Sequence, residues 1–184
     1  RQNIHDGTIE KTAAMSWGFV PLTRYQGGGP EAVLEPLAEH LEDYKQLMMQ
    51  YYGAGVQACY RGPRLYDTEK TKKTVSETIN WYKKYRDILN SDLIHLRRAD
   101  GRDWDGFLHV NPSSKQKAFI MLFNPTAEPI TRKVKIPLYY TGLASKANVK
   151  EKDGVSMTFS LNRNYEIELT VTIPANGNNW YIIE

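Results

Sequence analysis

The chain has 184 residues, with 24 lysines and arginines against 21 aspartates and glutamates, a formal net charge of +3. Because this weak positive balance includes no basic block, the composition gives no case for a nucleic-acid partner. The single cysteine excludes an intramolecular disulfide framework and a cysteine-based zinc cluster, and since no apolar run approaches the ~20 residues that cross a bilayer, we expect no membrane partner.

The N-terminal residues show few structural signals. The chain begins at Arg1 without an initiator methionine or an apolar signal segment, which favours an excised piece of a longer protein. Residues 1–14 are mostly polar and predict no regular element, with a turn expected at His5-Asp6-Gly7. Residues 15–22 are aromatic and β-branched, so we expect a buried strand there and a flexible loop after it.

Two helices and a second strand are expected next. Pro36 suits the first turn of a helix, and glycines 53 and 55 are typical of its end. Residues 56–60 predict the second strand, and Asp67 is a candidate cap for the second helix. The order strand, helix, strand, helix is that of parallel sheets, and two such units cannot cover their own strands. We therefore expect the end of a (β/α)8-type barrel.

From residue 106 the sequence reads as short strands separated by turns. Residues 118–123 are apolar throughout and predict a central strand covered on both faces. Residues 155–161 and 165–173 alternate between apolar and polar, which predicts a hairpin joined through residues 162–164. A turn at residues 99–103 separates the two parts. The predicted fold class is α+β mixed: an N-terminal β-α-β-α segment in residues 1–98 followed by a C-terminal antiparallel β-sandwich in residues 99–184.

Functional residues of a barrel lie in the loops after its strands, at the carboxyl end of the sheet. Arginine donates to sugar hydroxyls in a fork, and tyrosine stacks on a sugar face. These rules select six candidate substrate-binding residues: Arg24, Tyr25, Arg61, Arg64, Tyr66 and Asp67. The alternative is a structural role, in which Asp67 caps a helix and the arginines pair with surface acids.

No catalytic residue is assigned. A glycosidase needs two carboxyl groups roughly 5 to 10 Å apart, and no convincing pair is present, since Asp103 and Asp105 sit at the domain junction. The four histidines are scattered without metal-ligand spacing, and Cys59 lies in an apolar strand without a histidine partner in the sequence. We expect no metal and no cofactor.

Five segments carry a family resemblance: WGFVPL, YYGAGVQACYRGPRLYD, WYKKYRDIL, MLFNPTAEPITRKVKIPLYYTGL and VTIPANGNNWYIIE. Together they resemble the tail of secreted, α-galactosidase-like glycoside hydrolases, in which a catalytic (β/α)8 barrel is followed by an antiparallel β-sandwich. The resemblance implies that the catalytic carboxylates lie on earlier barrel strands, outside these residues. This agrees with the absence of a carboxylate pair in the sequence.

The first hypothesis is therefore a C-terminal fragment of a glycoside hydrolase, secreted, periplasmic or on the cell surface, which is inactive alone. Its expected partners are a carbohydrate and the remainder of the barrel, or a second copy of the chain. The alternatives are a carbohydrate-binding module, in which Tyr139, Tyr140 or Trp180 stacks on sugars, and a cell-surface interaction domain without a ligand site. Exposed, coplanar aromatic rings would favour the carbohydrate-binding module.

Overall fold

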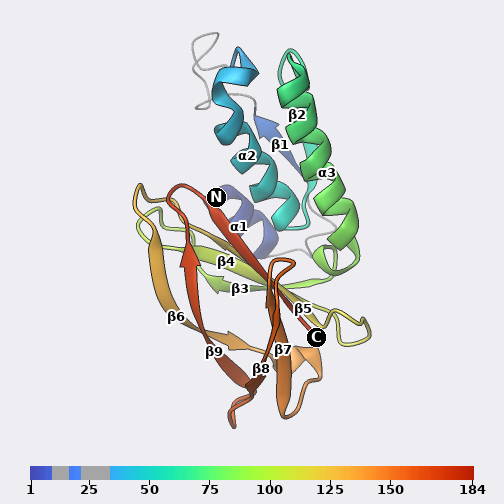
Figure 1. Ribbon diagram of the computed structural model, residues 1–184, viewed down its shortest axis with the longest axis vertical. Helices are drawn as coiled ribbons and strands as arrows, with labels where there is room; N and C mark the ends of the chain where they lie inside the picture. Colours follow the sequence, from blue (N-terminus) through green and yellow to red (C-terminus); the bar gives the residue numbers. More distant parts are fainter. Residues whose placement is uncertain (10–16, 22–33) are drawn as a thin grey trace.

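The computed structural model describes residues 1–9, 17–21 and 34–184. Helices gather at one pole of the molecule and most of the β-structure lies at the other (Figure 1). The strands of the described residues form a two-stranded parallel sheet, a six-stranded sheet and a two-stranded antiparallel sheet. In the described residues no helix has both the length and the apolarity to cross a membrane.

The N-terminal part contains the predicted βαβα order. Its elements are α1 (Gln2–Ile9), β1 (Trp17–Pro21), η3 (Leu37–His40), α2 (Leu41–Gly53), β2 (Gln57–Arg61) and α3 (Glu69–Leu89). β1 and β2 pair in parallel, from Trp17 opposite Gln57 to Pro21 opposite Arg61. The parallel pairing expected from the strand–helix–strand order is thus confirmed.

The helix α1 corrects the expectation that residues 1–14 form no regular element. Its sequence carries little helical signal, and its position depends on tertiary contacts. Ile4 is buried in the core under the helices, and the Thr8 hydroxyl lies 2.9 Å from Nε2 of His95 on the sandwich. Packing of this kind outweighs a weak local propensity.

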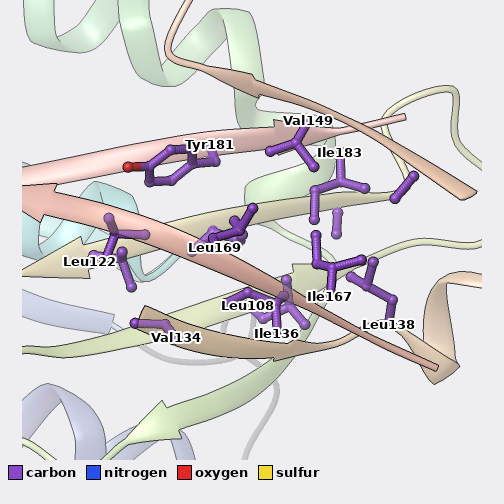
Figure 2. Packing of buried hydrophobic residues seen from close by; sticks show 14 of the residues in the cluster. Leu108, Leu122, Val134, Ile136, Leu138, Val149, Ile167, Leu169, Tyr181 and Ile183 are labelled. Carbon is purple, nitrogen blue, oxygen red and sulfur yellow. The ribbon is translucent and has the colours of Figure 1, made fainter. Parts of the chain in front are cut away.

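The C-terminal part is a sandwich of two sheets. The larger sheet has the order β3 (Asp92–Arg97), β4 (Asp105–Val110), β5 (Ala118–Phe123), β10 (Asn178–Ile183), β7 (Lys146–Glu151), β8 (Ser156–Ser160). Opposite it, β6 (Ile130–Pro137) pairs antiparallel with β9 (Glu166–Ile173). Apolar side chains of both sheets fill the space between them, among them Leu108 and Leu122 of the larger sheet and Ile136 and Ile167 of the smaller one (Figure 2). The predicted antiparallel β-sandwich is confirmed.

The prediction that residues 118–123 form a central, doubly covered strand is also confirmed. β5 lies between β4 and β10, and all six of its residues are buried. Ile120 and Leu122 belong to the core between the two sheets, whereas Phe119 and Met121 belong to the core beneath the helices.

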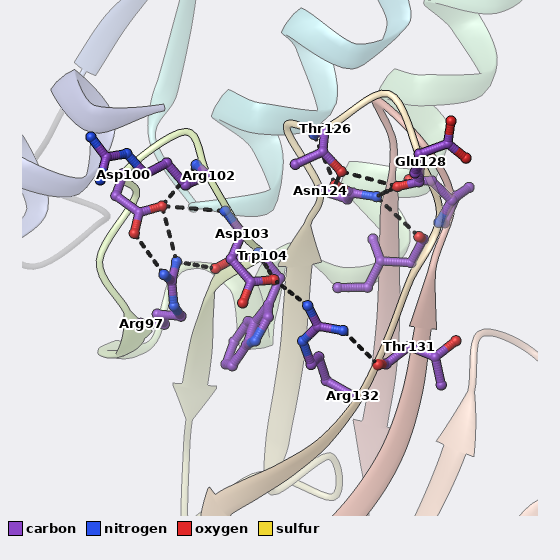
Figure 3. A network of polar contacts seen from close by, with 12 residues as sticks. Arg97, Asp100, Arg102, Asp103, Trp104, Asn124, Thr126, Glu128, Thr131 and Arg132 are labelled. Atoms are coloured by element: carbon purple, nitrogen blue, oxygen red, sulfur yellow. Dashed lines mark hydrogen bonds and ion pairs between the residues drawn. The ribbon is translucent and has the colours of Figure 1, made fainter.

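The turn expected at residues 99–103 is present, but it is the loop of a hairpin inside the sandwich. β3, which the boundary after residue 98 assigned to the N-terminal part, pairs antiparallel with β4. Asp100 holds the loop by accepting hydrogen bonds from Arg97 Nη2 at 2.6 Å and from the Arg102 N–H at 2.9 Å (Figure 3). The sandwich sheet therefore begins at Asp92, because a turn signal marks a hairpin as readily as a domain boundary.

The hairpin predicted for residues 155–161 and 165–173 is wrong. β8 pairs with β7, while β9 pairs with β6 in the opposite sheet, so the chain crosses between sheets at residues 161–165. The Asn162 carboxamide oxygen supports this corner by accepting hydrogen bonds from the N–H groups of Asn164 and Glu166, each at 2.9 Å. Alternation of side chains identifies a strand and its buried face, but it does not select the neighbouring strand.

An aromatic layer joins α3 to the sandwich. The rings of Phe119 and Trp180 stack with centroids 5.3 Å apart and planes inclined by 17°, and Tyr85 of α3 packs against both. The Tyr85 hydroxyl also donates to Asp153 Oδ1 at 2.6 Å, in the turn between β7 and β8. Helices and sandwich therefore share one continuous interface.

Candidate functional site

The candidate site lies at the carboxyl ends of β1 and β2, where the loop after β2 meets the segment leading into α2. Arg64 Nε is 3.2 Å from Glu35 Oε1, and the Ala38 N–H donates to Asp67 Oδ2 at 3.1 Å. The Tyr44 hydroxyl donates to the Leu65 carbonyl at 2.8 Å. An ion pair and two hydrogen bonds thus fix the loop of residues 62–68 against the preceding helical segment.

Asp67 occupies a structural position in this loop. Its Oδ1 accepts a 2.8 Å hydrogen bond from the Thr71 hydroxyl, in addition to the bond from Ala38 at Oδ2. Burial raises the pKa of Asp67, but the hydrogen bonds from Thr71 and Ala38 outweigh that effect and hold its pKa below the usual value. Asp67 is therefore ionised at neutral pH and unsuited to donate a proton.

The cap of α3 differs by one residue from the prediction. Thr68, not Asp67, is the N-cap residue, and its side chain accepts from the Thr71 N–H in a reciprocal capping box. Asp67 instead accepts a hydrogen bond from the Thr71 hydroxyl and links the start of α3 to the short helix η3. Both residues satisfy groups at the first turn, so sequence alone does not distinguish their roles.

Of the other five candidate residues, the structure describes the side chains of Arg64 and Tyr66. Tyr66 is 44% exposed, with the Lys72 ammonium 5.8 Å from its ring centroid, and the Arg64 side chain is 56% exposed. Arg61 is the last residue of β2, but its side chain lies outside the described part of the structure, as do Arg24 and Tyr25 entirely. The structure therefore places Arg64, Tyr66 and Asp67 in one loop, each with its own partners, and describes no side chain for the other three.

Glu35 and Tyr44 were not among the sequence candidates. A tyrosine at position 44 reads as part of the apolar face of α2, and that face gives no sign that its hydroxyl reaches Leu65. Tyr44 is fully buried and its ring meets Tyr60 edge-on, at a centroid distance of 6.5 Å. Burial raises the pKa of both tyrosines, so they stay neutral and support the loop.

The chemistry available in this loop is recognition rather than acid–base catalysis. Tyr66 offers an exposed aromatic ring, and Arg64 offers N–H donors at the solvent edge of its ion pair. Asp67 has both carboxylate oxygens engaged. Asp105, another acid considered in the sequence, is buried and paired with Arg1. Within the described residues, the loop thus presents no two free carboxyl groups across a common space.

Clefts occur elsewhere on the molecule. One of about 520 Å³ lies between α2 and the sandwich loops, with Gln46, Gln50, Asn124 and Asn176 in its lining. Another of about 380 Å³ lies beside Trp81 and Trp180. Neither is lined by any of the six candidate substrate-binding residues, and both follow the interface of helices and sandwich. Among the described side chains, no cluster of three histidine, cysteine or acidic residues has the arrangement of a metal site.

No protein-family model matches the sequence, and no curated protein is similar to it in sequence. The structure is similar to a GH27 β-L-arabinopyranosidase from Geobacillus stearothermophilus, with a TM-score of 0.59 and 9% identity over 100% of this chain and 42% of that one. It is similar to a GH36 α-galactosidase from the same organism, with a TM-score of 0.61 and 12% identity over 95% and 22% of the two chains.

A third similar structure is α-galactosidase I from Mortierella vinacea, with a TM-score of 0.54 and 13% identity over 95% of this chain and 43% of that one. The chain therefore spans less than half the length of these enzymes. The likeness confirms the fold expected from the resemblance to α-galactosidase-like enzymes, a βαβα segment followed by an antiparallel β-sandwich.

Proposed function

We propose that the chain is the C-terminal part of a glycoside hydrolase of the α-galactosidase type, contributing two closing βα units and an accessory sandwich. The observation that carries this proposal is the parallel pair β1–β2, with the loop after β2 tied to Glu35 and Ala38 and with the sandwich following directly. Fold likeness to enzymes more than twice as long supports it.

The isolated parallel pair supports the involvement of a partner. β1 and β2 form a sheet of only two strands within the described residues. Parallel strands are ordinarily central in larger sheets, with neighbours at the edges and cover on both faces. The remainder of a barrel would supply both, and a second copy of the chain is the alternative source of edge contacts.

In this proposal, the loop after β2 contributes to carbohydrate binding. Tyr66 stacks on a sugar ring, Arg64 donates to a hydroxyl, and Asp67 keeps the loop in place through Ala38 and Thr71. Arg61, at the end of β2, and Arg24 and Tyr25, after β1 in the sequence, are assigned to carbohydrate binding by the same rule. The acid and the nucleophile or base come from other strands of the barrel. Such an enzyme acts outside the cytoplasm, as a secreted, periplasmic or cell-surface protein.

The proposal is tested by assaying glycoside hydrolysis with the longer protein of which this chain would be the C-terminal part. We expect it to cleave nitrophenyl α-galactoside or β-L-arabinopyranoside, and we expect Tyr66→Ala to lower kcat/KM roughly threefold to tenfold by removing a stacking contact. Lys133→Ala, on the exposed face of β6, is the matched control and should leave kcat/KM unchanged. A longer product without glycosidase activity, or an unaltered Tyr66→Ala enzyme, would contradict the proposal.

A further inference from the structure

Three exposed tyrosines gather at the pole of the sandwich that lies away from the helices. Tyr139 and Tyr140 belong to the short helix η4 (Tyr139–Thr141), and Tyr165 ends the turn that leads into β9. Their exposed fractions are 63%, 65% and 40%. The end of β6 and the start of β9, which flank these residues, lie at the pole opposite α2 and α3 (Figure 1).

The three rings form one surface. Tyr139 meets Tyr140 and Tyr165 edge-on, with centroid distances of 5.3 and 5.4 Å and interplanar angles of 87° and 79°. Within the described part of the chain, none of their hydroxyls has a hydrogen-bond partner. The surface, here called the tyrosine corner patch and comprising Tyr139, Tyr140 and Tyr165, therefore offers both ring faces and free hydroxyls to a ligand.

Buried contacts hold the patch in place. Thr141 is buried and its hydroxyl donates to the Leu138 carbonyl at 2.6 Å, which anchors η4. Tyr165 adopts a φ of 59°, in the left-handed region that side chains other than glycine rarely occupy. Its carbonyl accepts a 2.8 Å bond from the Leu138 N–H. The fold thus maintains a strained residue in the position that brings its ring against Tyr139.

We propose that the tyrosine corner patch is a second carbohydrate-binding site, separate from the loop after β2. The assignment of a saccharide as the ligand of this patch rests on the proposed function. Aromatic side chains cover about 150–250 Å² each when fully buried, so three partly exposed rings fall short of the roughly 800 Å² per partner of a stable protein interface. A single sugar unit, by contrast, needs only one or two ring faces and a few hydroxyl contacts.

The neighbouring groups include hydrogen-bond donors and acceptors for a polyhydroxy ligand. The exposed Asn164 lies next to Tyr165 in the turn and can both donate to and accept from hydroxyl groups. Glu166 is engaged by the Asn162 carboxamide, whose Nδ2 lies 3.1 Å from Glu166 Oε2. Because this pole is remote from β1 and β2, additional barrel strands beside them would leave it open to solvent (Figure 1).

This surface differs from the sugar-stacking surface that the sequence predicted for a carbohydrate-binding module. Trp180, one of its three predicted members, is buried and stacked on Phe119, so it is not available to a ligand. The remaining rings are perpendicular rather than coplanar. A corner of this shape suits the end or a bend of a polysaccharide chain rather than a flat crystalline surface.

Affinity electrophoresis of the 184-residue chain tests the inference, in gels containing galactomannan, arabinogalactan or soluble starch. We expect retardation in at least one gel and a roughly threefold to tenfold weaker retention for Tyr140→Ala, with most of the retention kept by Tyr140→Phe. Val155→Ala is the matched control, because Val155 is an 86% exposed apolar residue in the turn between β7 and β8. The melting temperature of each variant shows that the fold is intact.

Normal mobility in all three gels, or equal retention by Tyr140→Ala and the original chain, would overturn the inference. A further result would also overturn it: self-association of the chain that Tyr140→Ala abolishes, together with no retention by any polysaccharide. That result would assign the patch to a protein contact. Failure of the proposed function is distinguishable: it would appear as inactivity of the longer protein and would leave the retention of this chain unaffected.

Discussion

Phe119 and Ile120 are consecutive residues of β5, and their side chains enter two different cores. Phe119 stacks on Trp180 in the aromatic layer beneath α3, whereas Ile120 packs between the two sheets of the sandwich. Since successive side chains of a strand point to opposite faces, this one strand couples the helical part to the sandwich. β5 is therefore the element on which stability should depend most.

Truncation of Ile120 or Leu122 to alanine should lower the free energy of unfolding by roughly 2 to 5 kcal/mol, because a cavity is added to the lost transfer energy. Lys133→Ala and Lys135→Ala serve as controls, since both lysines lie on the exposed face of β6, and each should change stability by less than about 0.5 kcal/mol. Denaturant melts of the four variants measure these changes. Equal losses for the lysine and the apolar variants would disprove the register of the sandwich.

Acid should destabilise the chain in part through His109. Burial lowers the pKa of His109 to about 4, while its Nε2 lies 2.8 Å from the Gly53 carbonyl. The folded state therefore resists protonation that the unfolded chain accepts near pH 6.5. The stabilising contribution of the neutral ring is complete above pH 6.5, and it should decline as the pH falls from 6.5 toward 4, by a few kcal/mol in total.

Denaturant melts between pH 7 and pH 4 measure this dependence. His109→Gln keeps a donor for the Gly53 carbonyl but cannot take up a proton, so its stability should depend less on pH over this range. His95 should contribute a further part, because burial together with His5 and Arg1 lowers its pKa to about 4. An identical pH dependence in His109→Gln and the original chain would show that His109 is not the titrating group.

The two-stranded parallel sheet should favour self-association of the isolated chain. β1 and β2 are paired only with each other in the described residues, and free strand edges are templates for further pairing. Light scattering across a concentration series should show a mass above that of the 21.2 kDa monomer. A strictly monomeric chain would count against an incomplete barrel.

Sequence periodicity predicted the elements whose side chains alternate or are uniformly apolar. β5 was recognised because its residues are uniformly apolar and β9 because apolar and polar residues alternate along it, and the parallel order of β1 and β2 followed from the helix between them. The missed features depend on contacts distant in sequence. Arg1 pairs with Asp105 and helps hold α1, a helix whose own residues give little sign of it.

The candidate site was predictable to the same extent. Arg64, Tyr66 and Asp67 share the one short loop after β2, as the sequence indicates, and their role in binding stays a prediction. Glu35, the partner of Arg64, and Ala38, the partner of Asp67, lie about thirty residues earlier in the sequence. Only the folded chain brings these residues together. The tyrosine corner patch likewise joins residues from two turns whose proximity depends on the pairing of β6 with β9.

The central claim is that this chain supplies the closing units of a barrel without the catalytic carboxylate pair. The most direct test is an assay of the isolated 184-residue chain for glycosidase activity. Purified protein should give no turnover of aryl glycosides of any common sugar, at any pH at which it remains folded. A robust rate that Asp67→Asn abolishes would contradict the claim, because it would place a catalytic carboxylate in the loop that we assign to carbohydrate binding.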